Sequence, residues 1–318
     1  MADLHELRTG RWDQIVLPDQ VEHYPTMLTH GERRLLHWLA RDVWEGWGAI
    51  VDAGCFLGGS TAALASGIAA REQAPAPGGP TPPMWTYDLF LADEFAIRSG
   101  HLSRWPDIRV DESFRAAFDD LIGDLGALTR VREGDITAEQ WDGGPIEILF
   151  LDVLKNPQIN DAVLSRFLPS LVAGRSVIVQ QDYVHGMLPW IHITMELLDD
   201  AVERIADEAG SRVYAVTGEI TAERIAEILP LDEQVSRERQ HELMERVVSD
   251  TWGDARGMLL LAQANLLRAH GQLATAEAIL AHVETRYRDA HSVSYDAAET
   301  RRVLERSGWS QRAEASVS

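Results

Sequence analysis

The sequence predicts an α/β fold, in which helices cover a doubly wound and mostly parallel sheet. Five short apolar stretches, each followed by polar residues, alternate with longer segments that have helical patterns. This alternation is typical of β-α-β units, whose parallel strands are buried on both faces. The first stretch, near residues 49–53, runs into a glycine-rich turn and then an alanine-rich segment, which predicts a strand, a tight turn and a helix.

The elements around this first unit follow from local signals. Thr29 and Glu32 have the spacing of a capping box, and apolar residues at helical intervals continue to Val43. The proline-rich segment 74–83 can be neither a helix nor a central strand, so we expect an exposed loop. Further strands are expected at 84–88, 129–132, 146–152 and 175–180, with interrupted helices over 93–128 and a helix over 159–171.

The C-terminal third is predicted to be mainly helical. We expect a helix over 190–205, a strand over 211–216 and helices across most of 222–309. The resulting division is an N-terminal cap and lead-in helix at 1–45, an α/β domain at 46–221 and a C-terminal helical region at 222–318. The last region is interpreted either as a homo-oligomer contact or as a solvated helical flank.

Composition limits the classes of function. The chain has 318 residues, of which 45% are hydrophobic, enough for a sizeable core. A net charge of -21 and a pI near 4.8 argue against a nucleic-acid partner. The single cysteine, Cys55, excludes an intrachain disulfide and fits a reducing compartment. With no bilayer-length apolar run and no secretory layout at the start, a cytoplasmic location without a membrane partner is expected.

The turn after the first strand has the order Asp-x-Gly-x-x-x-Gly-Gly, from Asp52 to Gly59. It lacks the Gly-x-Gly-x-x-Gly order of dinucleotide folds and the Lys of a P-loop, so neither hydride carriers nor nucleoside triphosphates are favoured. Glycines at 54 and 58 permit a sharp turn and the close approach of a ligand, and the helix that starts at 59–61 offers free N–H donors. These features predict a nucleotide-type site at the carboxyl end of the first strand.

Val51-Asp52-Ala53-Gly54 with Gly58-Gly59-Ser60-Thr61 resembles the first motif of class I S-adenosylmethionine-dependent methyltransferases. The variant is similar to that of small-molecule O-methyltransferases of macrolide and sugar tailoring. The resemblance implies a Rossmann-like class I methyltransferase fold, S-adenosyl-L-methionine as cofactor and a role in natural-product biosynthesis. It covers the chain up to Thr221, where the family pattern fades.

Acids at later strand ends extend the predicted cofactor site. Asp88 can accept both hydroxyl hydrogens of a ribose, and Phe90 is read either as an adenine neighbour or as ordinary packing. In the family, the acid that matches Asp135 meets the adenine amino group, with Ile136 beside it; the alternative is an ordinary Gly-Asp turn. The predicted cofactor-binding residues are Asp52, Gly54, Cys55, Phe56, Gly58, Ser60, Thr61, Asp88, Leu89, Phe90, Asp135, Ile136 and Asp152.

The predicted chemistry needs alignment of the reactants and, for a hydroxyl acceptor, removal of a proton. Asp152, Asp182 and the neutral ligand Gln181 follow the fourth and fifth strands and form a candidate Mg²⁺ site that would bind the acceptor oxygens. The sequence departs here from metal-dependent members of the family, because Lys155 stands where they carry a His.

Two side chains are candidates for the base. Lys155 can serve only if desolvation removes its proton, and it can otherwise be a charge partner that takes the place of the metal. His185 is the simpler base, because an imidazole titrates near neutrality, and His192 is the second choice. The predicted catalytic residues are Asp152, Lys155, Asp182 and His185.

Three functions remain open at this point. The favoured one is methyl transfer to a hydroxyl of a small molecule, a sugar or a secondary metabolite, with or without a divalent metal. The second is N- or C-methylation, or another reaction of the sulfonium on the same fold. The third is a non-catalytic adenosine-binding or scaffold protein.

Overall fold

The computed structural model describes residues 4–315, and the chain divides into two compact units. Unit 1 holds the chain up to residue 154 together with 162–181 and 200–225, and unit 2 holds 155–161, 182–199 and the chain from 226 onwards. The predicted boundaries at 45/46 and 221/222 stay predictions, and residues 1–3 and 316–318 of the end segments lie outside the described residues.

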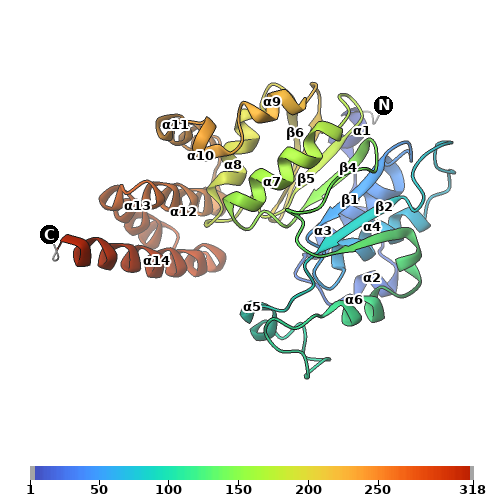
Figure 1. The fold of residues 1–318 in the computed structure, drawn as a ribbon, viewed down its shortest axis with the longest axis horizontal. Coiled ribbons are helices and arrows are strands. Elements are labelled where there is room, and N and C mark those ends of the chain that lie inside the picture. The colour runs from blue at the N-terminus through green and yellow to red at the C-terminus, as the bar shows by residue number, and fades with distance from the viewer. Residues whose placement is uncertain (1–3, 316–318) are drawn as a thin grey trace. The chain divides into compact units, whose positions relative to one another are not determined.

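Unit 1 is built on one seven-stranded sheet (Figure 1). Its strands are β1 (Ala49–Ala53), β2 (Met84–Asp88), β3 (Thr129–Glu133), β4 (Ile146–Leu151), β5 (Val177–Gln180), β6 (Val202–Glu208) and β7 (Ser211–Val216). The order is β3-β2-β1-β4-β5-β7-β6, in which β7 runs antiparallel to both neighbours and the first five strands are parallel. The predicted fold class, a Rossmann-like methyltransferase sheet with flanking helices, is confirmed.

The helices before β4 include those expected after Thr29, after the glycine turn and within 93–128, and three short ones before residue 23 that the sequence did not predict. They are α1 (Leu4–Thr9), η1 (Trp12–Gln14), α2 (Asp19–Glu22), α3 (His30–Trp38), η2 (Leu39–Val43), α4 (Gly59–Ala69), α5 (Glu94–Arg98), α6 (Arg115–Ile122) and η3 (Gly123–Leu128). The capping box of α3 is present: the Thr29 hydroxyl accepts from the Glu32 N–H at 3.2 Å, and the Glu32 carboxylate accepts from the Thr29 N–H at 2.9 Å. Glu32 also accepts from the Ser211 hydroxyl at 2.8 Å, so the cap ties α3 to the start of β7.

The central strands are fully buried, as a sheet covered on both faces requires. All residues of β1 and β4 are buried, and the small residues Ala62 and Ala63 let α4 pack closely. This packing fixes the carboxyl ends of β1, β2, β4 and β5, where the predicted site residues follow.

The expected helix over 190–205 is wrong in its second half. Helix α8 (Pro189–Leu197) ends early, and residues 202–208 form strand β6, which pairs with β7 around a turn at Ala209 and Gly210. Glu, Arg and Ala favour a helix locally, but pairing with β7 outweighs that preference. The charged residues of β6 suit an edge strand, because they discourage pairing with another chain.

Unit 2 is helical, as predicted. Its helices are α8, α10 (Leu231–Gln234), α11 (Arg237–Ser249), α12 (Gly253–Ala269), α13 (Leu273–Arg286) and α14 (His291–Ala315), together with the start of α7 (Pro157–Phe167). The rest of α7, η4 (Leu168–Ser170) and all of α9 (Ala222–Ala226) except its last residue belong to unit 1. Gly271, with φ +81°, makes the turn between α12 and α13. A separate core forms where Leu261, Ala264, Leu280 and Val293 meet. Among the described helices, none combines the length and apolar character needed to cross a bilayer.

Candidate functional site

Asp52 at the end of β1 binds the first turn of α4. Its carboxylate is fully buried and accepts hydrogen bonds from the Ser60 hydroxyl, at 3.0 Å to each oxygen, and from the Thr61 hydroxyl at 2.6 Å. Burial raises the pKa of Asp52 to about 7, against the opposing effect of the two hydroxyls. These three side chains are buried and bonded to one another, and a role for them in cofactor binding stays a prediction.

The glycines of the turn are required by the protein's own packing. Gly54 has φ +95°, and a Cβ there would lie 2.7 Å from the main-chain carbonyl of Asp152. Gly58 has φ +92°, and its Cβ would lie 2.8 Å from the Phe118 ring and the Tyr24 hydroxyl. The Tyr24 hydroxyl donates to the Leu57 carbonyl at 2.8 Å. The predicted space for a ligand against Gly54 and Gly58 is therefore filled by protein atoms.

Asp88 at the end of β2 holds two turns at once. One carboxylate oxygen accepts from the Phe56 N–H at 2.7 Å, and the other accepts from the Phe90 N–H at 2.8 Å. Phe56 and Phe90 have φ of 49° and 53°, a conformation that side chains other than glycine rarely adopt. Burial raises the pKa of Asp88. Each oxygen keeps a further lone pair, so the carboxylate can still accept hydroxyl hydrogens from a ribose.

An aromatic cluster surrounds these turns. The Phe56 ring lies 5.2 Å from Phe114 and 6.0 Å from His101, and the Phe90 ring lies 5.5 Å from Phe114. Phe90 is fully buried, which supports the packing interpretation, whereas Leu89 is half exposed. Phe114 and His101 were not predicted as neighbours of the site, because only the fold brings 101–114 to the glycine turn.

Cys55 is buried beside this cluster. Its Sγ lies 3.6 Å from the Phe56 carbonyl oxygen, and burial raises the pKa of the thiol well above its usual range. A thiol in such surroundings remains protonated and unreactive.

Asp135 follows β3 in a local turn. Its carboxylate accepts from the Thr137 N–H at 2.8 Å and from the Thr137 hydroxyl at 2.7 Å, and these bonds lower the pKa of Asp135. Ile136 is buried. The Gly134 N–H donates to the Asp88 main-chain carbonyl at 2.9 Å, which brings this turn beside the end of β2. The turn interpretation accounts for these bonds, while a contact between Asp135 and adenine stays a prediction.

Asp152 and Gln181 follow the adjacent strands β4 and β5 in unit 1. The Asp152 N–H donates to the Ala53 carbonyl at 2.8 Å, and the Gln181 N–H donates to the Leu151 carbonyl at 3.0 Å. The register therefore places both residues at the carboxyl edge of the sheet, as predicted from the strand ends.

In unit 2, the Lys155 ammonium forms an ion pair with the Asp182 carboxylate. Asp182 has φ +60°, so its backbone is held in a conformation that costs energy. Lys155 is the only lysine of the sequence. An ammonium on Asp182 competes for the carboxylate that a metal would need, and within residues 4–315 no group of three His, Cys, Asp or Glu side chains is arranged to hold a metal ion. The ion pair is the contact that the charge-partner interpretation of Lys155 expects, and a Mg²⁺ site at Asp152, Gln181 and Asp182 stays a prediction.

The two predicted bases differ in exposure. The His185 side chain is 34% exposed, and its Nδ1 lies 3.1 Å from the Met187 backbone nitrogen and 3.4 Å from an Asp296 carboxylate oxygen. His192 is fully buried, with its Nε2 2.6 Å from the Tyr183 carbonyl oxygen. His192 is thus placed as a packing residue, and His185 remains the candidate base.

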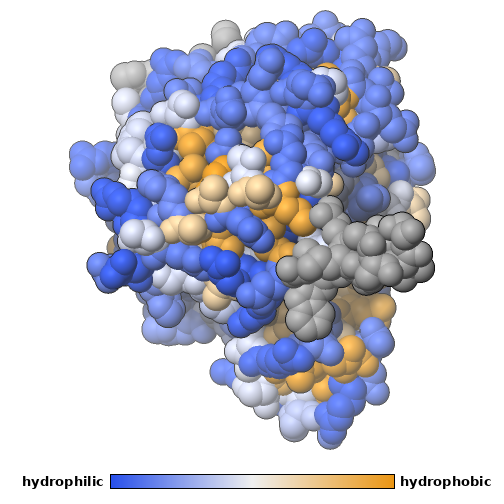
Figure 2. Space-filling view, turned by 90° about the vertical axis from the view of Figure 1, so that its left-hand side faces the viewer, coloured by the Kyte–Doolittle hydropathy of each residue, from blue (hydrophilic) through white to orange (hydrophobic). Residues whose placement is uncertain are grey.

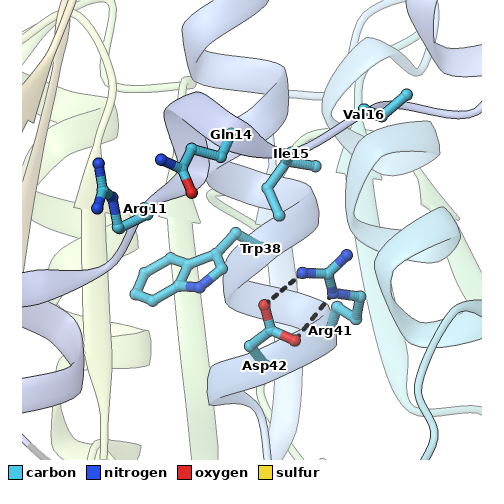
Figure 3. A pocket seen from close by; sticks show the side chains of 7 residues that line it. All are labelled: Arg11, Gln14, Ile15, Val16, Trp38, Arg41 and Asp42. Atoms are coloured by element: carbon cyan, nitrogen blue, oxygen red, sulfur yellow. Dashed lines mark hydrogen bonds and ion pairs between the residues drawn. The ribbon is translucent and has the colours of Figure 1, made fainter.

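A shallow cavity of about 470 Å³ lies elsewhere in unit 1. Figure 3 shows Arg11 and Arg41 at opposite ends of the Trp38 indole, with Arg41 turned toward Asp42. Arg41 donates two hydrogen bonds to Asp42, at 2.8 and 2.7 Å, so much of its charge is neutralised. None of the predicted site residues lines this cavity.

The segment that follows β2 carries exposed apolar side chains. Five large apolar residues of this segment are more than a third exposed: Leu89, Leu91, Phe95, Ile97 and Val110. Figure 2 shows apolar surface on the lowest lobe of that view, the part that carries α5 in Figure 1. Several exposed apolar side chains in one segment can contribute to binding an apolar molecule or partner. It begins directly after Asp88.

Comparison with known proteins gives a likeness of fold. The sequence matches no protein-family model and no curated protein. Among solved structures, the calicheamicin methyltransferase CalS11 is 16% identical, with a TM-score of 0.42 over 67% of this chain and 90% of that one. The Bacillus cereus O-methyltransferase in complex with SAH is 18% identical, with a TM-score of 0.40 over 64% of this chain and 93% of that one. The cofactor-bound Rv0187 from MTB is 16% identical, with a TM-score of 0.41 over 64% and 86%. The similar structures are methyltransferases, and at these identities the likeness concerns the fold alone.

Proposed function

We propose that this chain transfers a methyl group from S-adenosyl-L-methionine to a hydroxyl of a small molecule. The observation that carries the proposal is the position of Asp88. One carboxylate at the carboxyl end of β2 holds the glycine turn through the Phe56 N–H and its own turn through the Phe90 N–H. It retains lone pairs for a ribose diol, at the edge of the sheet where α/β folds bind nucleosides.

When bound, S-adenosyl-L-methionine supplies the methyl group on a sulfonium, and S-adenosylhomocysteine is left after transfer. Asp88 binds the ribose, and the half-buried Phe56 ring packs beside it. His185 takes the proton of the acceptor hydroxyl as the oxygen forms its bond to the methyl carbon. The methyl–sulfur bond of bound S-adenosyl-L-methionine would supply the methyl carbon and leave its electron pair on the sulfur of S-adenosylhomocysteine.

The reaction proposed here does not use a metal. The Lys155 ammonium already neutralises Asp182, which the predicted metal site would need. An ion pair favours the protonated form of a lysine, so Lys155 is the charge partner and His185 is the base.

The acceptor is proposed to be a sugar or secondary metabolite with an apolar part. Its apolar part fits the exposed side chains after β2, such as Leu89 and Phe95. Burial of that surface would add binding energy at about 25 cal/mol per Å².

Isothermal titration calorimetry with S-adenosylmethionine and S-adenosylhomocysteine tests the proposal. We expect both to bind, and Asp88→Asn to weaken binding about 10- to 100-fold, the amount expected for lost hydrogen bonds to a charged group. Asp119→Asn is the matched control, because Asp119 pairs with Arg115 on the surface of α6. Absence of binding to the unsubstituted protein would reject methyl transfer altogether.

A further inference from the structure

Side chains from two distant helices bind both polar groups of the Gly186 backbone. An Asp296 carboxylate oxygen, on α14, accepts from the Gly186 N–H at 3.0 Å across 110 positions of sequence. The Asn265 side-chain amide, on α12, donates to the Gly186 carbonyl at 3.0 Å across 79 positions. Asn265 also donates to the Thr300 hydroxyl on α14 at 3.0 Å, so the two helices are joined at this point.

This polar cluster is built into an apolar core. Asp296, Asn265 and Thr300 are 7%, 3% and 0% exposed. Burying such groups costs energy unless they are hydrogen-bonded. Here the Asp296 carboxylate, the Asn265 side-chain nitrogen and the Thr300 hydroxyl bind one another or the loop backbone, whereas the Asn265 side-chain oxygen has no partner among the described residues. A Cβ at Gly186 would lie 2.8 Å from the Leu261 Cβ and 3.1 Å from the Asp296 carboxylate, so the loop fits against α12 only with glycine there.

The same carboxylate faces the neighbouring His185. The Nδ1 of His185 can accept from the Met187 N–H, at 3.1 Å, or donate to the Asp296 oxygen, at 3.4 Å. In the first arrangement, the neutral ring carries its hydrogen on Nε2, which then cannot take another proton. In the second, Nδ1 carries the hydrogen, and Nε2 has the lone pair that a base needs.

We propose that Asp296 is a positioning residue for His185, supplied by the C-terminal helices. By accepting the Nδ1 hydrogen, Asp296 makes Nε2 basic, and its negative charge stabilises the imidazolium that forms when Nε2 takes the acceptor's proton. Asn265 and Thr300 hold the loop in register with this carboxylate. The inference that His185 takes the acceptor's proton rests on the proposed function. The inference that Asp296 determines which His185 ring nitrogen carries the hydrogen is independent of that function.

Asp296→Asn tests the inference, because it removes the charge and keeps the shape. With histidine labelled by ¹⁵N, ring nitrogen shifts report which nitrogen carries the hydrogen, and His185→Gln assigns the signal. We expect the Nδ1–H form of His185 in the unsubstituted protein and its loss in Asp296→Asn. We expect kcat to fall about 10- to 100-fold, within the usual contribution of a general base, with KM for S-adenosylmethionine unchanged. Glu299→Gln on the same helix is the control, because Glu299 pairs with Arg302.

A second variant separates positioning from stability. Asn265→Leu should raise hydrogen exchange at the Gly186 amide and lower kcat, while Asp296 still faces the ring. The inference is overturned if His185 has the same ring form with and without Asp296, or if Asp296→Asn keeps the full kcat. If S-adenosylmethionine does not bind, the proposed function fails, and the nitrogen shifts still decide whether Asp296 controls the His185 ring.

Discussion

Two acids at the ends of neighbouring strands have different surroundings. Asp52 accepts only from the hydroxyls of the first turn of α4, and its side chain is inaccessible. Asp88 accepts backbone N–H bonds from two turns and keeps acceptor capacity. The sequence places both acids at strand ends, and their hydrogen-bond partners show that the first binds only protein hydroxyls, whereas the proposal that the second binds a ribose uses its remaining acceptor capacity.

The buried Asp52 predicts a specific pH dependence of stability. Its pKa rises from 3.8 to about 7 on folding, so between these values the folded state keeps a proton that the unfolded state releases. This contribution is fully present below about pH 4 and is lost as pH rises through about 7. Relative to Asp52→Asn, the free energy of unfolding of the unsubstituted protein should fall with pH across that range.

Urea denaturation of the two proteins at several pH values measures this difference. Asp124→Asn, an exposed acid in η3, serves as the control. Parallel pH profiles for the unsubstituted protein and Asp52→Asn would show that Asp52 is ionised in the folded state.

Helices and strands that are determined by short stretches of sequence can be predicted from the sequence alone. The apolar runs of β1 and β4, the Thr29 capping box and the strand-end positions of Asp88 and Asp152 are each visible in a short window. Strand β6 was missed because its composition favours a helix and only pairing with β7 makes it a strand. The sequence also did not show which protein atoms lie against the two glycines of the turn. The Asp152 backbone lies against Gly54, and the Phe118 and Tyr24 side chains lie against Gly58, and all three come from other parts of the chain.

Gly58→Ala tests this account of the β1–α4 turn. The substitution adds a Cβ at φ +92° against Phe118 and Tyr24, so we expect a loss of about 1–3 kcal/mol in the free energy of unfolding. Gly144→Ala has a similar φ of +79° with open space around it, and it isolates the backbone cost from the clash. Thermal and urea unfolding measure both, and an equal loss in the two variants would contradict the packing role of Gly58.

At the scale of the whole molecule, the candidate site draws on parts of the chain that no sequence window connects. His185 follows β5, while Asp296 and Asn265 lie on helices beyond the stretch that resembles the methyltransferase family. Nothing in the spacing of α12 or α14 distinguishes these polar residues from surface residues of an ordinary amphipathic helix. Only the packing of α12 and α14 shows that they are buried against the loop.

The strongly acidic composition of the chain bears on whether a divalent cation binds beside Lys155. The chain has 50 acidic residues against 29 Lys and Arg, and its single lysine is paired with Asp182. An acidic protein attracts divalent cations nonspecifically, but a Mg²⁺ ion that binds Asp182 would have to displace the Lys155 ammonium.

We therefore expect full methyl transfer after treatment with a chelator and no rise in melting temperature on adding Mg²⁺. In Lys155→Met, the freed Asp182 carboxylate should let Mg²⁺ raise the melting temperature, whereas Lys155→Arg should behave like the unsubstituted protein. Activity that is lost on chelation and restored by Mg²⁺ would show instead that Asp182 serves a metal during catalysis.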